Sequence, residues 1–133
     1  MNPIYQKVTK SKLTKNLLDP IILQYLEKES LHGYQLIIKI RKDYGVYFGP
    51  STIYPLLNML EKKGCLKSAW NMKAEKPRKE YALTAEGKQV LKLEEDSLNM
   101  ICRRLTEKIG LKPEQLSEGM IVQQSNHRTI IHL

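Results

Sequence analysis

The chain has 133 residues, which is enough for one domain with a buried core. Its 22 lysines and arginines outnumber 14 aspartates and glutamates, and the resulting formal net charge of +8 favours polyanionic partners such as nucleic acid or anionic membrane, with a merely well-solvated surface as the alternative. No apolar run is long enough to span a bilayer and the N-terminus lacks the apolar stretch of a signal peptide, so we expect a cytoplasmic protein with no membrane partner.

Residues 1–16 carry lysines but no acidic residue. Two interpretations stay open for this segment, namely a frayed, solvated terminus or a basic arm that lies along phosphates. The first predicted helix follows in "DPIILQYLEKES", with Asp19 as its N-cap and Pro20 at its first position. We expect Ile22, Leu23 and Leu26 to form its buried stripe.

A second helix is predicted in "HGYQLIIKIRKDYG", residues 32–45, because apolar residues recur on one face and Gly45 provides a C-terminal stop. His32 begins this helix, and it either binds a phosphate or makes a helix-start hydrogen bond. We expect Gly33 to let two helices approach closely and Tyr34 to pack against the protein.

The third predicted helix, "GPSTIYPLLNMLEKKG" (residues 49–64), contains a proline in its second turn. If the helix begins at Thr52, Pro55 lies in the first turn and removes no hydrogen bond. If it begins at Pro50, the Ser51 carbonyl loses its usual partner and the first turn bends. We favour the second account, since water can satisfy a carbonyl on an exposed face.

After the third predicted helix the apolar residues recur at every second position. The segments "CLKSAWN" (65–71) and "RKEYALT" (78–84) alternate between apolar and polar residues and are predicted to be two strands. The basic loop "MKAEKP" joins them, and we expect Trp70 to pack in the core or at the root of the hairpin.

A long helix is predicted in residues 84–110, with Thr84 as N-cap. Its apolar residues form a narrow seam near coiled-coil spacing, and we expect this seam to form a homodimer interface through Leu91, Leu98, Ile101 and Leu105. Packing against the chain's own N-terminal helix is the alternative, and both can hold at once. Residues 111–133 are predicted to contain one short helix from Pro113 and a tail that the pattern does not place.

Three helices followed by a hairpin with a basic tip are the order of a winged helix-turn-helix. The predicted fold class is therefore α+β, mainly α, with a winged helix-turn-helix followed by a C-terminal dimerisation helix. The predicted organisation is a basic arm (1–16), a DNA-binding domain (17–84), a dimerisation helix (85–110) and a tail of uncertain structure (111–133).

In this architecture the third helix enters the major groove and the hairpin, or wing, lies on the DNA backbone. The first turns of the third helix carry short polar or aromatic groups instead of long acids, and we expect the DNA contacts of this recognition helix to be Ser51, Thr52, Tyr54, Asn58 and Lys62. An ordinary exposed helix face is the alternative. The predicted phosphate contacts of the wing and of the start of the second helix are Lys73, Lys76, Arg78, Lys79 and His32, against the alternative of a solvated run of charges.

Catalysis and cofactor binding have little support in the sequence. Cys65 and Cys102 form no CxxC pair, and the three histidines show no ligand spacing, so we predict reduced thiols, no metal and no other cofactor. No nucleophile is patterned with a base and no phosphate-binding glycine loop is present, so we expect no enzyme activity.

Three stretches, "LHGYQLIIKI", "STIYPLLNMLEKKGCLKSAW" and "KPRKEYALTAEG", resemble in order and spacing the signatures of the PadR family of transcriptional regulators. The resemblance runs from about Leu17 to about Leu105. It implies a homodimeric DNA-binding repressor whose C-terminal helix crosses the partner's N-terminal helix, and which an unidentified small molecule or signal releases from its operator.

The sequence departs from the family pattern at three places. Glu75-Lys76-Pro77 replaces the usual glycine before the wing proline, and Glu80 replaces one of two tyrosines. Leu98 stands where multidrug-responsive relatives carry a tryptophan, which argues against a drug pocket of stacked tryptophans. Two other functions remain alternatives to a repressor: a winged-helix protein–protein adaptor, and a DNA-binding partition or replication-control protein.

Overall fold

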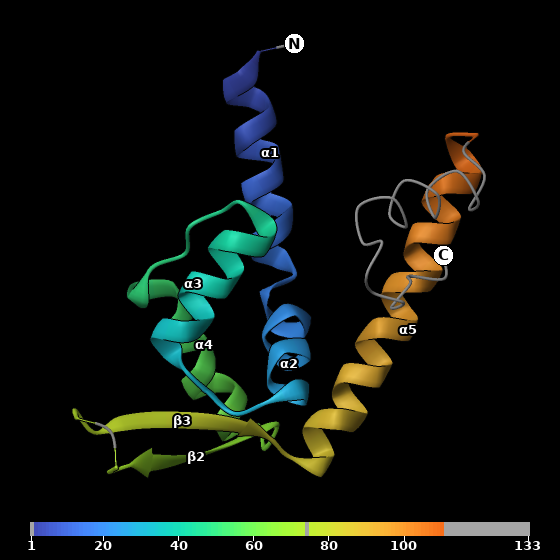
Figure 1. The fold of residues 1–133 in the computed structure, drawn as a ribbon. Helices are drawn as coiled ribbons and strands as arrows, with labels where there is room; N and C mark the ends of the chain where they lie inside the picture. Colours follow the sequence, from blue (N-terminus) through green and yellow to red (C-terminus); the bar gives the residue numbers. More distant parts are fainter. Residues whose placement is uncertain (1, 74, 111–133) are drawn as a thin grey trace. The chain divides into compact units, whose positions relative to one another are not determined.

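The structure is a computed structural model, and it describes residues 2–73 and 75–110 (Figure 1). The chain forms two compact units, one that ends at Leu91 and one that begins at Lys92. The helices and strands, in chain order, are α1 (Pro3–Asn16), α2 (Leu18–Lys28), β1 (Leu31–His32), α3 (Gly33–Tyr44), α4 (Pro50–Lys62), β2 (Leu66–Asn71), β3 (Arg78–Leu83) and α5 (Ala85–Lys108).

The first unit contains a three-stranded antiparallel sheet in the order β1-β3-β2. Strands β2 and β3 form the predicted hairpin, with Leu66 opposite Leu83 near its base and Asn71 opposite Arg78 near its tip. Strand β1 was not predicted, because two residues cannot show alternation. Its Leu31 and His32 pair with Tyr81 and Glu80 of β3. The predicted mainly α winged helix-turn-helix fold is thus confirmed.

The N-terminal segment is a largely exposed helix, so of the two interpretations of this segment the frayed terminus is wrong, and the basic arm stays a prediction. The side chain of Asn2 accepts a hydrogen bond from the Ile4 N–H at 2.9 Å, and Pro3 follows at the first helical position, where its missing N–H costs nothing. The apolar residues of α1 form no regular buried stripe, and several of them are exposed, among them Ile4, Tyr5 and Val8.

Helix α2 begins at Leu18, one residue before the predicted N-cap at Asp19. Pro20 is therefore its third residue instead of its first, a position where a backbone N–H still lacks an intrahelical partner. The predicted inner stripe is confirmed, since Ile22, Leu23 and Leu26 are all buried. They join one core with the buried side chains of α3, α4 and the sheet.

The start of α5 is fixed to the base of the hairpin. Thr84 caps the helix as predicted: its Oγ1 accepts a hydrogen bond from the Gly87 N–H at 2.9 Å and donates to the Gly64 carbonyl at 2.6 Å. Gly87 lies against the backbone, since a Cβ added there would be 2.2 Å from the Cys65 carbonyl oxygen. The predicted short helix from Pro113 lies outside the described residues.

Candidate nucleic-acid interface

Helices α3 and α4 form the helix-turn-helix, and both begin close to their predicted positions. His32 is the N-cap of α3 and lies in a capping-box arrangement with Gln35, in which the Gln35 Oε1 accepts from the His32 N–H (3.0 Å) and the Gln35 N–H faces the His32 Nδ1 at 3.3 Å. Gly45 ends α3 with a φ of 70°, the left-handed conformation that favours glycine.

Helix α4 begins at Pro50, so the second account of Pro55 is the one that the structure confirms. The Gly49 carbonyl accepts from the N–H groups of Thr52 and Ile53 at 3.0 Å. Pro55 then lies inside the helix, where it supplies no N–H to the carbonyl of Ser51.

The two sides of α4 differ in burial. One side is buried in the core through Ile53, Leu57 and Leu60. The other carries the predicted recognition residues, of which Thr52 is half-buried and four are exposed, namely Ser51, Tyr54, Asn58 and Lys62. The structure therefore brings all five to the outer part of one helix.

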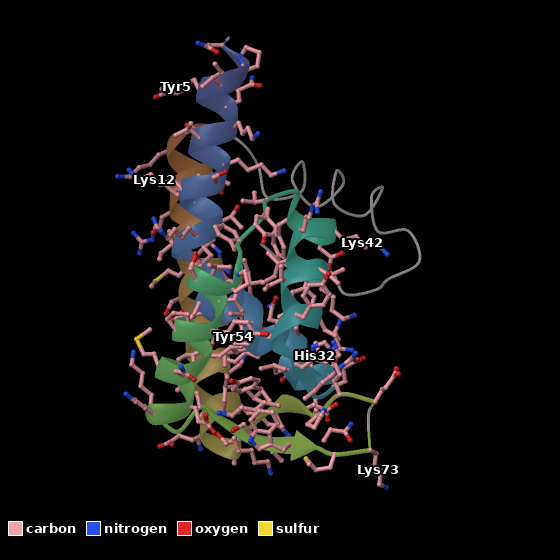
Figure 2. The ribbon with its side chains drawn as sticks, turned by 90° about the vertical axis from the view of Figure 1, so that its left-hand side faces the viewer. Tyr5, Lys12, His32, Lys42, Tyr54 and Lys73 are labelled. Carbon is pink, nitrogen blue, oxygen red and sulfur yellow. The ribbon has the colours of Figure 1, made fainter. Side chains whose placement is uncertain are left out.

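Tyr54 lies over the start of α3. A Cβ added to Gly33 would lie 2.5 Å from the Tyr54 ring, so Gly33 lets the two helices approach, as predicted. Figure 2 shows Tyr54 and His32 on the same face of the molecule. The expectation that Tyr34 packs is wrong, because its side chain at the second residue of α3 points outward and is 62 % exposed.

Three of the four predicted wing residues, Lys73, Lys76 and Arg78, are exposed, and Figure 2 shows Lys73 at the end of the hairpin. The expectation that Trp70 packs is wrong, since its side chain is 63 % exposed. Along the same face of β2, Leu66 is buried and Ser68 is half-buried, so burial declines toward the tip. The hairpin therefore extends beyond the core.

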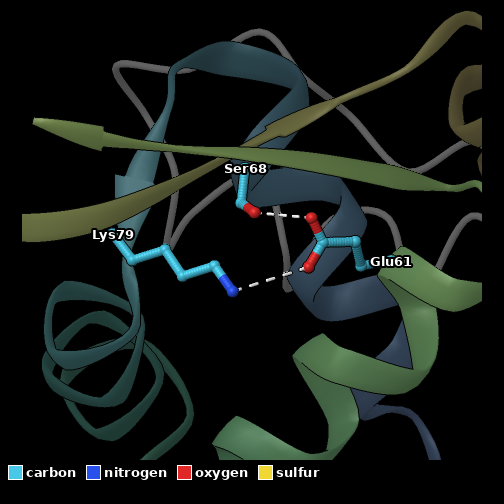
Figure 3. A network of polar contacts seen from close by, with 3 residues as sticks. All are labelled: Glu61, Ser68 and Lys79. Atoms are coloured by element: carbon cyan, nitrogen blue, oxygen red, sulfur yellow. Dashed lines mark hydrogen bonds and ion pairs between the residues drawn. The ribbon is translucent and has the colours of Figure 1, made fainter.

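Lys79 differs from the other wing residues. Its Nζ lies 3.8 Å from a Glu61 oxygen and 5.6 Å from the centre of the Tyr81 ring. The other Glu61 oxygen accepts a hydrogen bond from the Ser68 hydroxyl at 2.5 Å (Figure 3). Because side chains alternate along β3, Lys79 shares the Tyr81 face and points toward α4. The Lys79 ammonium is thus engaged within the chain, whereas the sequence pattern grouped it with the phosphate contacts.

His32 joins the start of α3 to the wing. Its side chain is largely buried, and its Nε2 lies 3.1 Å from Nη1 of Arg78. Burial, followed by the nearby Arg78 guanidinium, lowers the pKa of His32, while Glu80 acts in the opposite direction. The structure confirms the interpretation of His32 as a helix-start hydrogen-bonding residue, and its contact with phosphate stays a prediction.

The predicted dimer seam divides between the two units. Leu91 is 1 % exposed and belongs to the core of the first unit, so its assignment to a dimer interface is wrong: one chain already covers its side chain. Within the second unit Leu98 is half-buried, while Ile101 and Leu105 are 51 % and 57 % exposed. These three residues keep the interface prediction.

Among the described residues, no helix has the length and apolar composition to cross a bilayer. In the same residues no three histidine, cysteine, aspartate or glutamate side chains are grouped so that they could hold a metal ion. Cys65 is buried and Cys102 is half-buried, and the two cysteines form no disulfide with each other.

Comparison with known proteins agrees with this geometry. Residues 22–93 match the model of the "Transcriptional regulator PadR-like family", which confirms the resemblance seen in the sequence. A PadR family transcriptional regulator from Eggerthella lenta is 31 % identical, with a TM-score of 0.70 over 81 % of this chain and 97 % of that one. A PadR family transcription regulator from Clostridium difficile is 27 % identical, with a TM-score of 0.63 over 70 % and 97 % of the two chains.

The structure of Bacillus subtilis PadR in complex with operator DNA is also similar. It is 32 % identical, with a TM-score of 0.52 over 56 % of this chain and 44 % of that one. No curated protein matched the chain.

Proposed function

This chain belongs to the PadR-like family of transcriptional regulators, and from that premise we propose that it is a dimeric repressor that binds a specific sequence of double-stranded DNA. In this proposal α4 enters the major groove and the β2–β3 hairpin lies on the phosphate backbone. The B. subtilis relative in complex with operator DNA supports double-stranded DNA as the ligand.

The observation that carries the proposal is the contrast between the two sides of α4. Its buried side anchors the helix, and its exposed side offers hydroxyl, phenol, amide and ammonium groups, which can hydrogen-bond base edges and phosphates. Glu61, the acidic residue of α4, is turned toward Ser68 and Lys79. A helix with this polar surface can approach the polyanion without like-charge repulsion.

The wing supports the proposal through its charge. Lys73, Lys76 and Arg78 are exposed around the end of the hairpin. Each phosphate that such residues neutralise contributes about 0.9 to the log–log slope of affinity against salt concentration. We therefore expect these residues to contribute to affinity more than to the choice of sequence.

Dimerisation is proposed through the second unit. The exposed apolar side chains of Ile101 and Leu105, with the half-buried Leu98, repeat at the spacing by which paired helices pack. A two-fold symmetric dimer presents two copies of α4 to two half-sites, so the operator is expected to be palindromic. Gel filtration with light scattering tests the dimer, and Leu98→Lys should shift it toward the monomer.

Selection of duplexes from a random pool tests the proposed function. We expect enrichment of a two-fold symmetric site and a loss of about tenfold or more in affinity with Asn58→Ala, because a base contact by a paired amide contributes roughly 1–3 kcal/mol. Gln89→Ala, an exposed amide on α5, is the matched control and should bind like the unsubstituted chain. Binding without sequence preference, or a lasting monomer, would contradict the proposal and favour an adaptor.

A further inference from the structure

The imidazole of His32 faces hydrogen-bond donors at both of its nitrogens. On one side the Gln35 N–H lies 3.3 Å from Nδ1, and on the other the Arg78 Nη1 lies 3.1 Å from Nε2. Gln35 belongs to the first turn of α3 and Arg78 to strand β3, so this ring connects the helix-turn-helix to the wing.

A neutral imidazole cannot accept from both donors. It has one N–H and one free lone pair, while a guanidinium and a backbone N–H only donate. If Nε2 accepts from Arg78, the ring hydrogen is on Nδ1 and faces the Gln35 N–H. If Nδ1 accepts from Gln35, the hydrogen is on Nε2 and faces Arg78. A protonated ring satisfies neither neighbour.

The shorter contact and the charge of Arg78 favour the first arrangement, because a hydrogen bond from a charged donor is stronger than one from a backbone amide. The neighbouring acid does not remove the conflict. Glu80, which pairs with His32 across the strands, accepts from the Asn71 side chain at 3.2 Å. The α3 cap is therefore weakened while Arg78 holds the ring.

An oxygen acceptor between the two side chains would remove the conflict. It could accept from Arg78 and from an Nε2–H together, and Nδ1 would then be free to accept from the Gln35 N–H. With Arg78 exposed on the wing, a phosphate oxygen of bound DNA is the acceptor that the proposed function supplies.

We infer that His32 holds Arg78 through Nε2 in the free chain and exchanges its ring tautomer when Arg78 transfers to a DNA phosphate, with the Nδ1 proton passing to water and Nε2 taking a proton from water. The inference rests on the proposed function. In the bound state Nε2–H and Arg78 donate to one phosphate, and the α3 capping bond is restored. DNA binding thereby strengthens the start of α3 as well as the wing contact.

A double-mutant cycle tests the pairing, with a duplex selected from the random pool as the probe. His32→Asn is the informative variant, because asparagine is a favoured N-cap but is too short to replace Nε2. Arg78→Ala should lower the salt slope by about 0.9 and the affinity by about tenfold, the value of a charge-assisted hydrogen bond. We expect His32→Asn to weaken binding by several-fold alone and by clearly less in Arg78→Ala, because part of its effect passes through Arg78.

Additive effects of the two substitutions, or unchanged binding by a stably folded His32→Asn, would overturn the inference. The affinity lost with Asn58→Ala would still test the proposed function separately. If no duplex is selected at all, the proposed function fails and the inference fails with it. A folded state for each variant is checked by its melting temperature.

Nitrogen NMR of the unsubstituted chain, labelled with ¹⁵N-histidine, gives a second test that needs no variant to fold for its readout. We expect an Nδ1–H tautomer of His32 in the free chain and an Nε2–H tautomer with the selected duplex. Sequential assignment distinguishes the His32 signals from those of the other two histidines. The same tautomer in both states would contradict the inference.

Discussion

The carboxylate of Glu61 and the ammonium of Lys79 face each other at 3.8 Å across the joint between α4 and strand β3 (Figure 3). The same carboxylate accepts from Ser68 on β2, so one acid fixes both strands of the hairpin to α4. Helix α4, which we propose to contact bases, is thus joined by side chains to the hairpin, which we propose to contact the DNA backbone. This joint limits how far the wing can turn away from α4.

We predict that Glu61→Gln raises DNA affinity and changes stability little. Glutamine can still accept from Ser68, but it removes the ion pair and leaves the Lys79 charge available to phosphate. A partly exposed ion pair contributes about 0–1 kcal/mol to folding, whereas one additional phosphate contact steepens the salt slope by about 0.9. Salt titrations of binding check the slope, with Glu27→Gln, an exposed acid of α2, as control. A shallower slope for Glu61→Gln would contradict this account.

We predict that Gly33→Ala displaces the Tyr54 ring and costs about 1 kcal/mol, the low end for overpacking. The new methyl group would meet the ring at 2.5 Å, but Tyr54 is 39 % exposed and its ring can move outward. Urea unfolding measures the loss of stability. When Gly33→Ala is made in the Tyr54→Ala variant, the loss of stability should disappear. A loss that persists in that variant would show that the close approach of the helix backbones, and not the Tyr54 ring, requires glycine.

We predict that Gly87→Ala costs more than Gly33→Ala, about 2–3 kcal/mol. The new methyl group would lie 2.2 Å from the Cys65 carbonyl oxygen, and a backbone atom held by the hairpin cannot move aside as a side chain can. Urea unfolding of the two alanine variants side by side makes the comparison. Equal losses would show that the start of α5 shifts freely.

Particular residues show why the sequence predicted some features and not others. Gly45, Thr84 and the alternation of residues 66–71 act through local backbone chemistry, so their roles could be predicted from short stretches. Strand β1 depends on pairing with β3, almost fifty residues later, and two residues show no period. Leu91 has the same apolar character whether it faces a partner or its own core, and the tertiary fold alone separates the two cases.

The candidate site shows the same division. The row of polar residues on α4 follows from helical periodicity, and its exposure agrees with that prediction. Lys79 and Arg78 are neighbours in the sequence with equal charge, yet they contact Glu61 and His32 on opposite faces of β3. Counting lysines and arginines in a hairpin cannot separate these two environments.

We predict that His32 makes the folded state less stable as the pH falls below 6.5. Its pKa is lowered from the ordinary value of 6.5, so below this pH the unfolded chain binds a proton that the folded chain resists. The contribution of neutral His32 to the free energy of unfolding is complete above pH 6.5. It declines as the pH falls toward the lowered pKa of His32 in the folded chain. Urea unfolding between pH 7.5 and 5 measures the decline, and His32→Asn should reduce it. Parallel pH profiles for the two proteins would contradict the prediction.

Pro55 gives α4 an acceptor that no side chain encodes. Because proline supplies no N–H, the carbonyl of Ser51 lacks its α-helical partner in the part of the helix that also carries the exposed Ser51 and Tyr54 side chains. Exocyclic amino groups of cytosine and adenine donate in the major groove, and a main-chain oxygen can receive them. Alanine scanning would leave this oxygen in place at every position except 55, where Pro55→Ala restores the helical bond and withdraws the acceptor.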